Sequence, residues 1–242
     1  MHIASEKFVA SAVAAGVVGV LLFGLATIRS PAVAAVGNVA VPAMIESPGV
    51  KPVAPVRSET VVFAGGCFWG VQGVFEHVKG VRRAVSGYIG GSAMTAHYEI
   101  VGTGQTGHAE AVQVTFDPSQ VSYAQLMRVF FSVVHDPTQL NYQGPDHGTQ
   151  YRSAIYTTTP AQLRATTTYI AQLTKAGTFR APIVTKVETA KPFYPAERHH
   201  QDYMALNPDA AYIRYWDAPK VEALREHFPT LYRATPVLLT QR

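Results

Sequence analysis

The chain contains a single cysteine, Cys67, which limits how its fold can be stabilised. One cysteine cannot close an internal disulfide, so the chain must fold without that cross-link. Cys67 follows an apolar run and two glycines, and it opens a stretch with the pattern of a helix. The free N–H groups at a helix N-terminus lower the pKa of a thiol, and the thiolate is its nucleophilic form. With Phe68 and Trp69 directly after it, Cys67 is predicted to be a nucleophile beside an apolar pocket for a small, soft group.

The composition is that of a globular protein with one main domain. The 242 residues are 48% hydrophobic and 15% charged, which is typical of a chain that buries a core. The net charge is +4, and the basic residues do not form runs. Because phosphate binding needs clustered Lys and Arg, we expect no nucleic-acid partner.

The N-terminal region has a different character from the rest. No charged residue occurs between Lys7 and Arg29, and residues 8–28 are long and apolar enough to cross a bilayer. Ala32-Val33-Ala34 resembles a signal-peptide cleavage site. Residues 1–34 are therefore interpreted as a signal peptide or an uncleaved N-terminal membrane anchor. Either would export the chain, to the periplasm or to the membrane surface facing it, and only this segment would contact the membrane.

Proline content then separates a linker from the catalytic domain. Residues 35–58 hold four prolines and little periodicity, so we predict an extended linker there. The domain is predicted to cover residues 59–242. Within it, strands are expected at 60–64, 82–89, 110–116, 153–157 and 183–189.

Helix signals lie between these strands. A helix is expected over 67–77, and Ser122 with Gln125 forms a capping-box pattern for the next one. Thr159-Pro160 starts a helix that Gly177 ends, and Asp217 precedes an amphipathic C-terminal helix. Several connections are too short for a parallel crossover. We therefore predict an α+β fold, a two-layer sandwich related to ferredoxin-like folds, with a mixed or antiparallel sheet and flanking helices.

Four polar residues in or beside glycine-containing segments stand out as site candidates: Tyr98, Glu110, Asp146 and Tyr151. Each alone has an ordinary structural explanation, as a packed aromatic, a solvated carboxylate or a turn cap. Their presence in one domain with an activatable thiol favours a common site. No dinucleotide-binding glycine pattern and no zinc-ligand spacing occurs, so we expect neither a bound cofactor nor a metal.

Four motifs in order resemble the peptide methionine sulfoxide reductase A family. They are Gly66-Cys67-Phe68-Trp69-Gly70, Gly107-His108-Ala109-Glu110, the segment 146–153, and Lys191-Pro192-Phe193-Tyr194 with His200-Gln201-Asp202-Tyr203. The resemblance implies that Cys67 is the nucleophile and that Phe68 and Trp69 hold the methyl group of the sulfoxide. It also implies that Glu110 protonates the sulfoxide oxygen, that Tyr98 and Tyr151 polarise it, and that Asp146 binds the substrate amide.

The resemblance further implies the reaction. Methionine-S-sulfoxide in oxidised proteins, in peptides or as the free amino acid would be reduced, leaving Cys67 as a sulfenic acid. Many relatives carry a second, resolving cysteine, and this chain has none. We therefore expect an external thiol reductant: a thioredoxin-like protein, a glutaredoxin-like protein or a small thiol. We expect a monomer.

Two other functions fit some of the same residues. A cysteine hydrolase would use Cys67 with His108 or His147 and Asp146. Alternatively, Cys67, Phe68 and Trp69 could be packed core in a non-catalytic envelope binding module. A histidine beside Cys67 would be required for the hydrolase.

Overall fold

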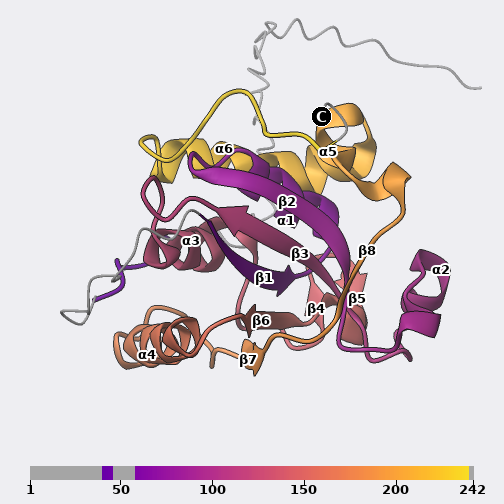
Figure 1. Cartoon of the computed structure of the whole chain (residues 1–242). Coiled ribbons are helices and arrows are strands. Elements are labelled where there is room, and N and C mark those ends of the chain that lie inside the picture. The colour runs from indigo at the N-terminus through magenta and orange to yellow at the C-terminus, as the bar shows by residue number, and fades with distance from the viewer. Residues whose placement is uncertain (1–39, 46–57, 240–242) are drawn as a thin grey trace, which may run out of the picture. The chain divides into compact units, whose positions relative to one another are not determined.

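The computed structural model describes residues 40–45 and 58–239. Its centre is a six-stranded sheet with the order β7-β6-β1-β3-β2-β8 (Figure 1). Neighbouring strands are antiparallel except β6 and β7, which are parallel. The predicted mixed sheet is thus confirmed. Its strands are β1 Glu59–Gly65, β2 Val81–Ile89, β3 Ala109–Phe116, β6 Ser153–Thr157, β7 Lys186–Thr189 and β8 Phe193–Pro195.

The connectivity of the four central strands has the ferredoxin-like pattern. Helix α1 (Phe68–Glu76) connects β1 to β2, and β3 lies between those two strands. Helix α3 (Tyr123–Val129) and a following π-helical turn (Phe130–Val134) lead from β3 toward β6, and β1 lies between those strands. Each helical connection therefore joins two strands that are separated by one strand between them. The two joined strands run parallel to each other, although each pairs antiparallel with the strand between them.

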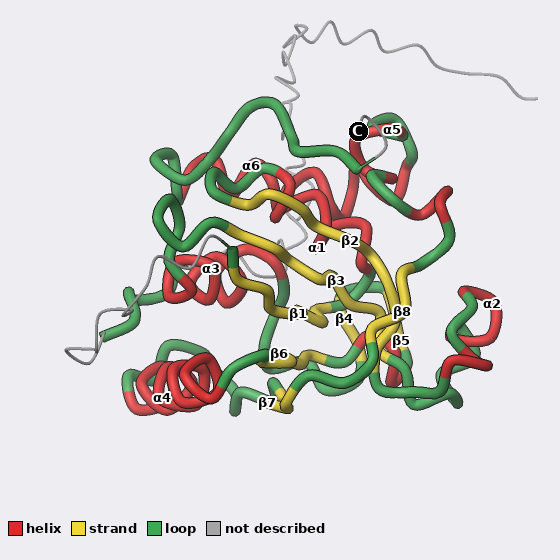
Figure 2. The backbone as a smooth tube through the Cα atoms, in the orientation of Figure 1, coloured by secondary structure: helices red, strands yellow, loops and turns green. Residues whose placement is uncertain are grey.

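Side-chain alternation in the strands creates the two layers. Val61 and Phe63 of β1 belong to the large core with the helices, whereas Val62 and Ala64 face the opposite side. The Phe63 ring stacks on Phe75 of α1, with 4.8 Å between ring centroids. Helices α1, α3, α4 (Pro160–Lys175) and α6 (Ala218–His227) all contribute to this large core. The predicted two-layer α+β class is confirmed (Figure 2).

The predicted helix starts are confirmed in their hydrogen bonding. Ser122 Oγ accepts the Gln125 N–H at 3.2 Å, and the Ser122 N–H donates to Gln125 Oε1 at 2.8 Å. Thr159 Oγ1 accepts the Gln162 N–H at 3.1 Å at the start of α4, and Gly177 follows its end with φ of +60°. The strand predicted at 183–189 is shorter, because only 186–189 pair with β6.

Several short elements were not predicted. One of them is β8 (Phe193–Pro195), the edge strand that pairs with β2. The others are α2 Tyr98–Val101, β4 Tyr142–Gln143, β5 Asp146–His147, α5 Tyr203–Leu206, the 3-10 turns at 93–95, 149–151 and 198–200, and a second π-helical turn at Ile213–Asp217.

Residues 40–45 correct the predicted linker. Val41 is fully buried, and its N–H donates to Ser132 Oγ at 3.2 Å. The Tyr169 hydroxyl donates to the Pro42 carbonyl at 2.6 Å, and Gln172 binds Ala43 and Ile45. This part of the proline-containing stretch is thus packed on α3 and α4, because its apolar side chain and backbone acceptors find partners there. Residues 46–57 and the predicted signal or anchor at 1–34 lie outside the described residues.

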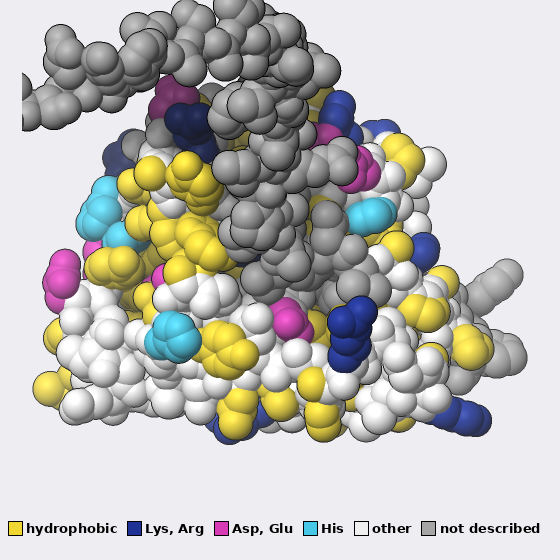
Figure 3. Space-filling view, turned by 180° about the vertical axis from the view of Figure 1, so that it is seen from behind, with side chains coloured by type: hydrophobic (Ala, Val, Ile, Leu, Met, Phe, Trp, Pro, Cys, Tyr) yellow, Lys and Arg dark blue, Asp and Glu magenta, His cyan; other side chains and the backbone are white. Residues whose placement is uncertain are grey.

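Within the described ranges, no helix is both apolar enough and long enough to cross a bilayer. On the face shown in Figure 3, Lys and Arg side chains are dispersed among hydrophobic, acidic and uncharged ones. Among the described residues visible on that face, Lys and Arg therefore do not gather in one patch.

Candidate active site

Cys67 lies where β1 ends and α1 begins. It is the N-cap residue of α1, with φ of −52° and ψ of 124°, and it is 9% exposed. The preceding Gly66 has φ of +92°, and a Cβ there would lie 2.6 Å from Gln143 Cβ. Glycine is required at this turn for both reasons. The turn places the thiol at the helix N-terminus, as predicted.

The electrostatics of the thiol differ from the prediction. Burial raises the pKa of Cys67 most, and the carboxyl groups of Glu110, Asp217 and Asp146 raise it further. The hydrogen bond from the Trp69 N–H lowers the pKa, but it does not compensate. The predicted net lowering by the helix N-terminus is therefore wrong for the unliganded site. The thiol is protonated at rest, because desolvation and three acidic neighbours outweigh one amide dipole.

Glu110 lies on β3 and faces the same helix terminus. It is 2% exposed, and its Oε2 accepts the backbone N–H of Phe68 at 3.1 Å. Burial raises the pKa of Glu110 to about 8, Asp146 and Asp217 also raise it, and the Phe68 N–H lowers it. A carboxyl with this pKa is largely protonated near neutral pH and can donate a proton.

The two aromatic residues after Cys67 occupy different environments. Phe68 is fully buried and packs near Tyr98, with 6.4 Å between ring centroids. Trp69 is only partly buried, and its ring stacks on Tyr203 at 3.9 Å. Its Nε1–H donates to His200 Nδ1 at 3.2 Å. Two contacts thus fix the indole, while Phe68 forms the base of the aromatic wall.

The two predicted tyrosines come from separate loops. Tyr98 begins α2, where its N–H donates to Glu197 Oε1 at 3.0 Å. Burial raises the pKa of Tyr98 to about 12, followed by the charges of Glu110 and Cys67. Tyr151 ends a 3-10 turn, and burial, then Glu110, Asp146 and Cys67, raise its pKa. Both hydroxyls therefore keep their protons near neutral pH and can donate hydrogen bonds.

Asp146 has a partner that the sequence analysis did not identify. The Tyr212 hydroxyl donates to Asp146 Oδ2, and the Tyr212 ring lies edge-on to Trp69 with 5.9 Å between centroids. Tyr212 thereby connects the predicted amide-binding carboxylate to the aromatic wall. It belongs to no motif or periodic pattern, so only the tertiary structure reveals it.

A buried ion pair was also missed. Lys220 Nζ contacts Asp217 Oδ1 at 3.0 Å, and both lie against Gly70 in the first turn of α1. The sequence predicted Asp217 to precede the C-terminal helix. It does so, but it makes no side-chain cap hydrogen bond there.

The two histidines proposed for a hydrolase, His108 and His147, contact groups other than Cys67. Both ring nitrogens of His108 bond to backbone groups, Nε2 to the Ser92 carbonyl at 2.9 Å and Nδ1 to the Gly91 N–H at 3.2 Å. His147 stacks on Tyr142 at 5.3 Å. In the ranges 40–45 and 58–239, no hydrogen bond joins either imidazole to Cys67. The dyad that a cysteine hydrolase requires is not formed.

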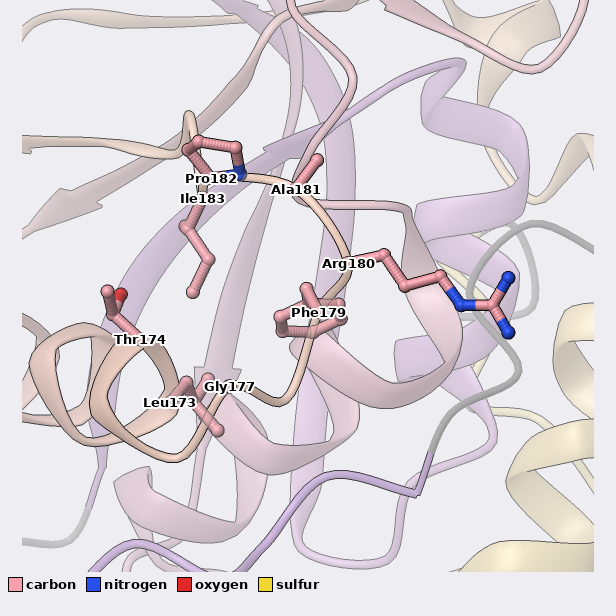
Figure 4. A pocket seen from close by; sticks show the side chains of 8 residues that line it. All are labelled: Leu173, Thr174, Gly177, Phe179, Arg180, Ala181, Pro182 and Ile183. Atoms are coloured by element: carbon pink, nitrogen blue, oxygen red, sulfur yellow. The ribbon is translucent and has the colours of Figure 1, made fainter.

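A separate pocket of about 260 Å³ lies beyond the C-terminal end of α4 (Figure 4). Its lining is largely apolar, with Arg180 as its ionisable residue. It contains neither a nucleophile nor a carboxyl group. The carboxyl and tyrosine side chains described above lie instead around Cys67.

Comparison with known proteins decides the family. The profile described as "Peptide methionine sulfoxide reductase" matches residues 59–231. The chain belongs to the peptide methionine sulfoxide reductase family. It is 61% identical over 182 residues to peptide methionine sulfoxide reductase MsrA 2 of Mesorhizobium japonicum, covering 75% of this chain and 93% of the relative. It is 47% identical over 177 residues to MsrA 2 of Synechocystis, covering 73% and 83%.

Solved structures of other peptide methionine sulfoxide reductases have the same fold. Mxr1 of Saccharomyces cerevisiae in reduced form aligns with a TM-score of 0.57 and 32% identity, over 65% of this chain and 90% of that one. Methionine sulfoxide reductase A of Corynebacterium diphtheriae aligns with a TM-score of 0.55 and 38% identity, over 63% and 76%. As a family member, the chain is an oxidoreductase that reduces methionine sulfoxide. The sequence-based family assignment is confirmed.

Proposed function

We propose that Cys67 reduces the S epimer of methionine sulfoxide with Glu110 as the proton donor. The observation that carries this assignment is the bond from the Phe68 N–H to Glu110 Oε2 at 3.1 Å. Phe68 directly follows the nucleophile, so this bond fixes the acid beside the helix terminus that presents the sulfur.

The proposed step transfers the sulfoxide oxygen to Cys67. Cys67 Sγ attacks the sulfoxide sulfur and forms an S–S bond, while Glu110 gives its proton to the sulfoxide oxygen and receives the thiol proton in its place. The hydroxyl group of this adduct then moves to Sγ, as the S–O and S–S bonds to the methionine sulfur both break. The products are methionine, reduced by two electrons, and a Cys67 sulfenic acid, oxidised by two.

The surrounding residues would bind the substrate in defined ways. Phe68 and Trp69 offer an apolar surface for the methyl group, and Tyr98 and Tyr151 offer hydroxyl donors to the oxygen as negative charge develops. Asp146, oriented by Tyr212, would accept the amide N–H of a peptide substrate. Oxidised proteins, peptides and free methionine sulfoxide all carry the reacting group.

Regeneration must use a thiol from outside the chain. Because Cys67 is the single cysteine, no intramolecular disulfide can form. One external thiol would condense with the sulfenic acid, releasing water and leaving a mixed disulfide, and a second thiol would release Cys67. A thioredoxin-like protein, a glutaredoxin-like protein or a small thiol could supply both equivalents.

The cellular setting is proposed from the N-terminal sequence. The uncharged stretch between Lys7 and Arg29 supports export, to the periplasm or to the membrane surface facing it. The reductant must then also work outside the cytosol. We propose that the catalytic domain acts there as a monomer.

The test is turnover of a methionine sulfoxide peptide with dithiothreitol, using separated S and R epimers. Wild type is expected to reduce the S epimer, and Cys67→Ser is expected to be inactive. Mass spectrometry of an enzyme exposed to substrate without thiol should show one added oxygen on Cys67. Activity that persists in Cys67→Ser, or equal use of both epimers, would contradict the proposal.

A further inference from the structure

The ion pair between Asp217 and Lys220 is buried beneath the helix that carries Cys67. The Asp217 side chain is 0% exposed and that of Lys220 is 12% exposed, with 3.0 Å between Lys220 Nζ and Asp217 Oδ1. Asp217 Oδ2 has no hydrogen-bond partner among the described residues. The pair is formed at the start of α6, where the chain leaves the π-helical turn.

Gly70 allows this pair to approach the helix closely. A Cβ on Gly70 would lie 2.0 Å from Asp217 Oδ1 and 2.9 Å from Lys220 Nζ. Gly70 is three residues after Cys67, in the first turn of α1. The charges therefore pack against the backbone turn whose N-cap is the nucleophile.

The thiol otherwise has mostly acidic neighbours. Glu110, Asp217 and Asp146 each oppose ionisation of Cys67 and raise its pKa. Lys220 is a basic neighbour instead. The negative charge of Asp217, and to a smaller extent that of Cys67, raises the pKa of the Lys220 ammonium. Opposite charges attract each other, so the Lys220 ammonium favours the Cys67 anion.

We propose that Lys220 is a positioning residue for the thiol chemistry: Asp217 holds its ammonium against the first turn of α1, where it serves as the countercharge of the Cys67 anion. A buried ion pair contributes little net stability, because desolvation offsets its attraction. The position of the Asp217–Lys220 pair beneath Cys67 is better explained by the electrostatic field that Lys220 exerts on the sulfur. The catalytic consequence rests on the proposed function, in which Cys67 loses its proton as it attacks and negative charge develops on Sγ.

The experiment measures the rate at which iodoacetamide alkylates Cys67 as a function of pH. Wild type is compared with Lys220→Gln, whose side-chain amide can still donate a hydrogen bond to Asp217 but carries no charge. We expect the variant to react about tenfold more slowly at pH 7, which corresponds to a midpoint about one pH unit higher. Equal rates in the two proteins would overturn the proposal.

Two further variants complete the test. Arg225→Met removes an exposed ion pair with Glu222, at the same spacing on the same helix, and should leave alkylation unchanged. Should Lys220→Gln not fold by circular dichroism, Lys220→Met against wild type decides: slower alkylation supports the proposal and an unchanged rate overturns it. Alkylation uses no sulfoxide, so failure of the sulfoxide assay would contradict the proposed function and leave this result intact.

Discussion

Glu110 Oε2 accepts a hydrogen bond from the backbone N–H of Phe68 at 3.1 Å, deep inside the domain. This bond joins strand β3 to the first turn of α1, at the residue after Cys67. It lowers the pKa of Glu110, whereas burial, the larger effect, raises it, and the result is a pKa of about 8. Glu110 is therefore largely protonated near neutral pH, and it can still release its proton during the reaction.

Replacing Glu110 by Gln should leave a folded enzyme with much lower turnover. The amide oxygen can still accept the Phe68 N–H, but the side chain can no longer supply a proton. General acid catalysis contributes about 10²–10⁴-fold, so we expect kcat to fall within that range. Steady-state kinetics with the S-sulfoxide peptide gives the measurement, and thermal unfolding serves as the control. Near-normal kcat would rule out Glu110 as the acid.

The pH profile should show the same group. Glu110 carries its proton below about pH 8 and loses it above. Turnover that depends on the acid form must therefore decline as pH rises through about 8. The alkaline decline should disappear in Glu110→Gln, which has no proton to lose at this position. A decline that is identical in both proteins would assign it to another group.

Tyr212→Phe should weaken substrate binding more than chemistry. The change removes the donor to Asp146 but keeps the ring that lies against Trp69. A hydrogen bond to a charged group contributes about 1.5 kcal/mol at the low end, so KM for a peptide sulfoxide should rise about tenfold. We expect kcat to stay within about twofold of wild type. Tyr215→Phe is the matched control, because Tyr215 is 78% exposed.

Gly70→Ala should destabilise the domain even though alanine favours helices. The new Cβ would lie 2.0 Å from Asp217 Oδ1, in a site that the Asp217–Lys220 pair fills. Overpacking of this kind costs about 1–3 kcal/mol, which exceeds the gain of about 1 kcal/mol in helix propensity. The expected loss of Tm is about 2–4 °C per kcal/mol. Gly73→Ala, also in α1, meets the flexible end of Met204 and should cost less.

Val41→Ala should test whether residues 40–45 are part of the folded domain. Val41 is fully buried against the large core, so removing its methyl groups should cost about 1–3 kcal/mol of unfolding free energy. Ile45 is 74% exposed, and Ile45→Ala should change stability by less than about 0.5 kcal/mol. Denaturant unfolding distinguishes the two. Equal effects would place residue 41 outside the cooperative unit.

Much of the fold could be predicted because its signals are local. The apolar run in β1, the alternation in β3, the Ser122 capping box and the Thr159-Pro160 start of α4 each depend on residues a few positions apart. The packing of residues 40–45 could not be predicted in this way. Prolines predict an extended chain, but they do not predict the hydrogen bond between Val41 and Ser132, because the two residues lie 91 positions apart in the sequence.

The sequence by itself indicated the family, which the relatives confirm, and it predicted Cys67 as the nucleophile and an external thiol as the reductant, because four ordered motifs and one cysteine are readable without coordinates. Only the tertiary structure decided the protonation of the site. Burial, and charges brought in from β3, β5 and the start of α6, keep the Cys67 thiol and Glu110 protonated. Desolvation and Coulomb interactions depend on distances in space, and these arise from contacts between residues that lie far apart in the chain.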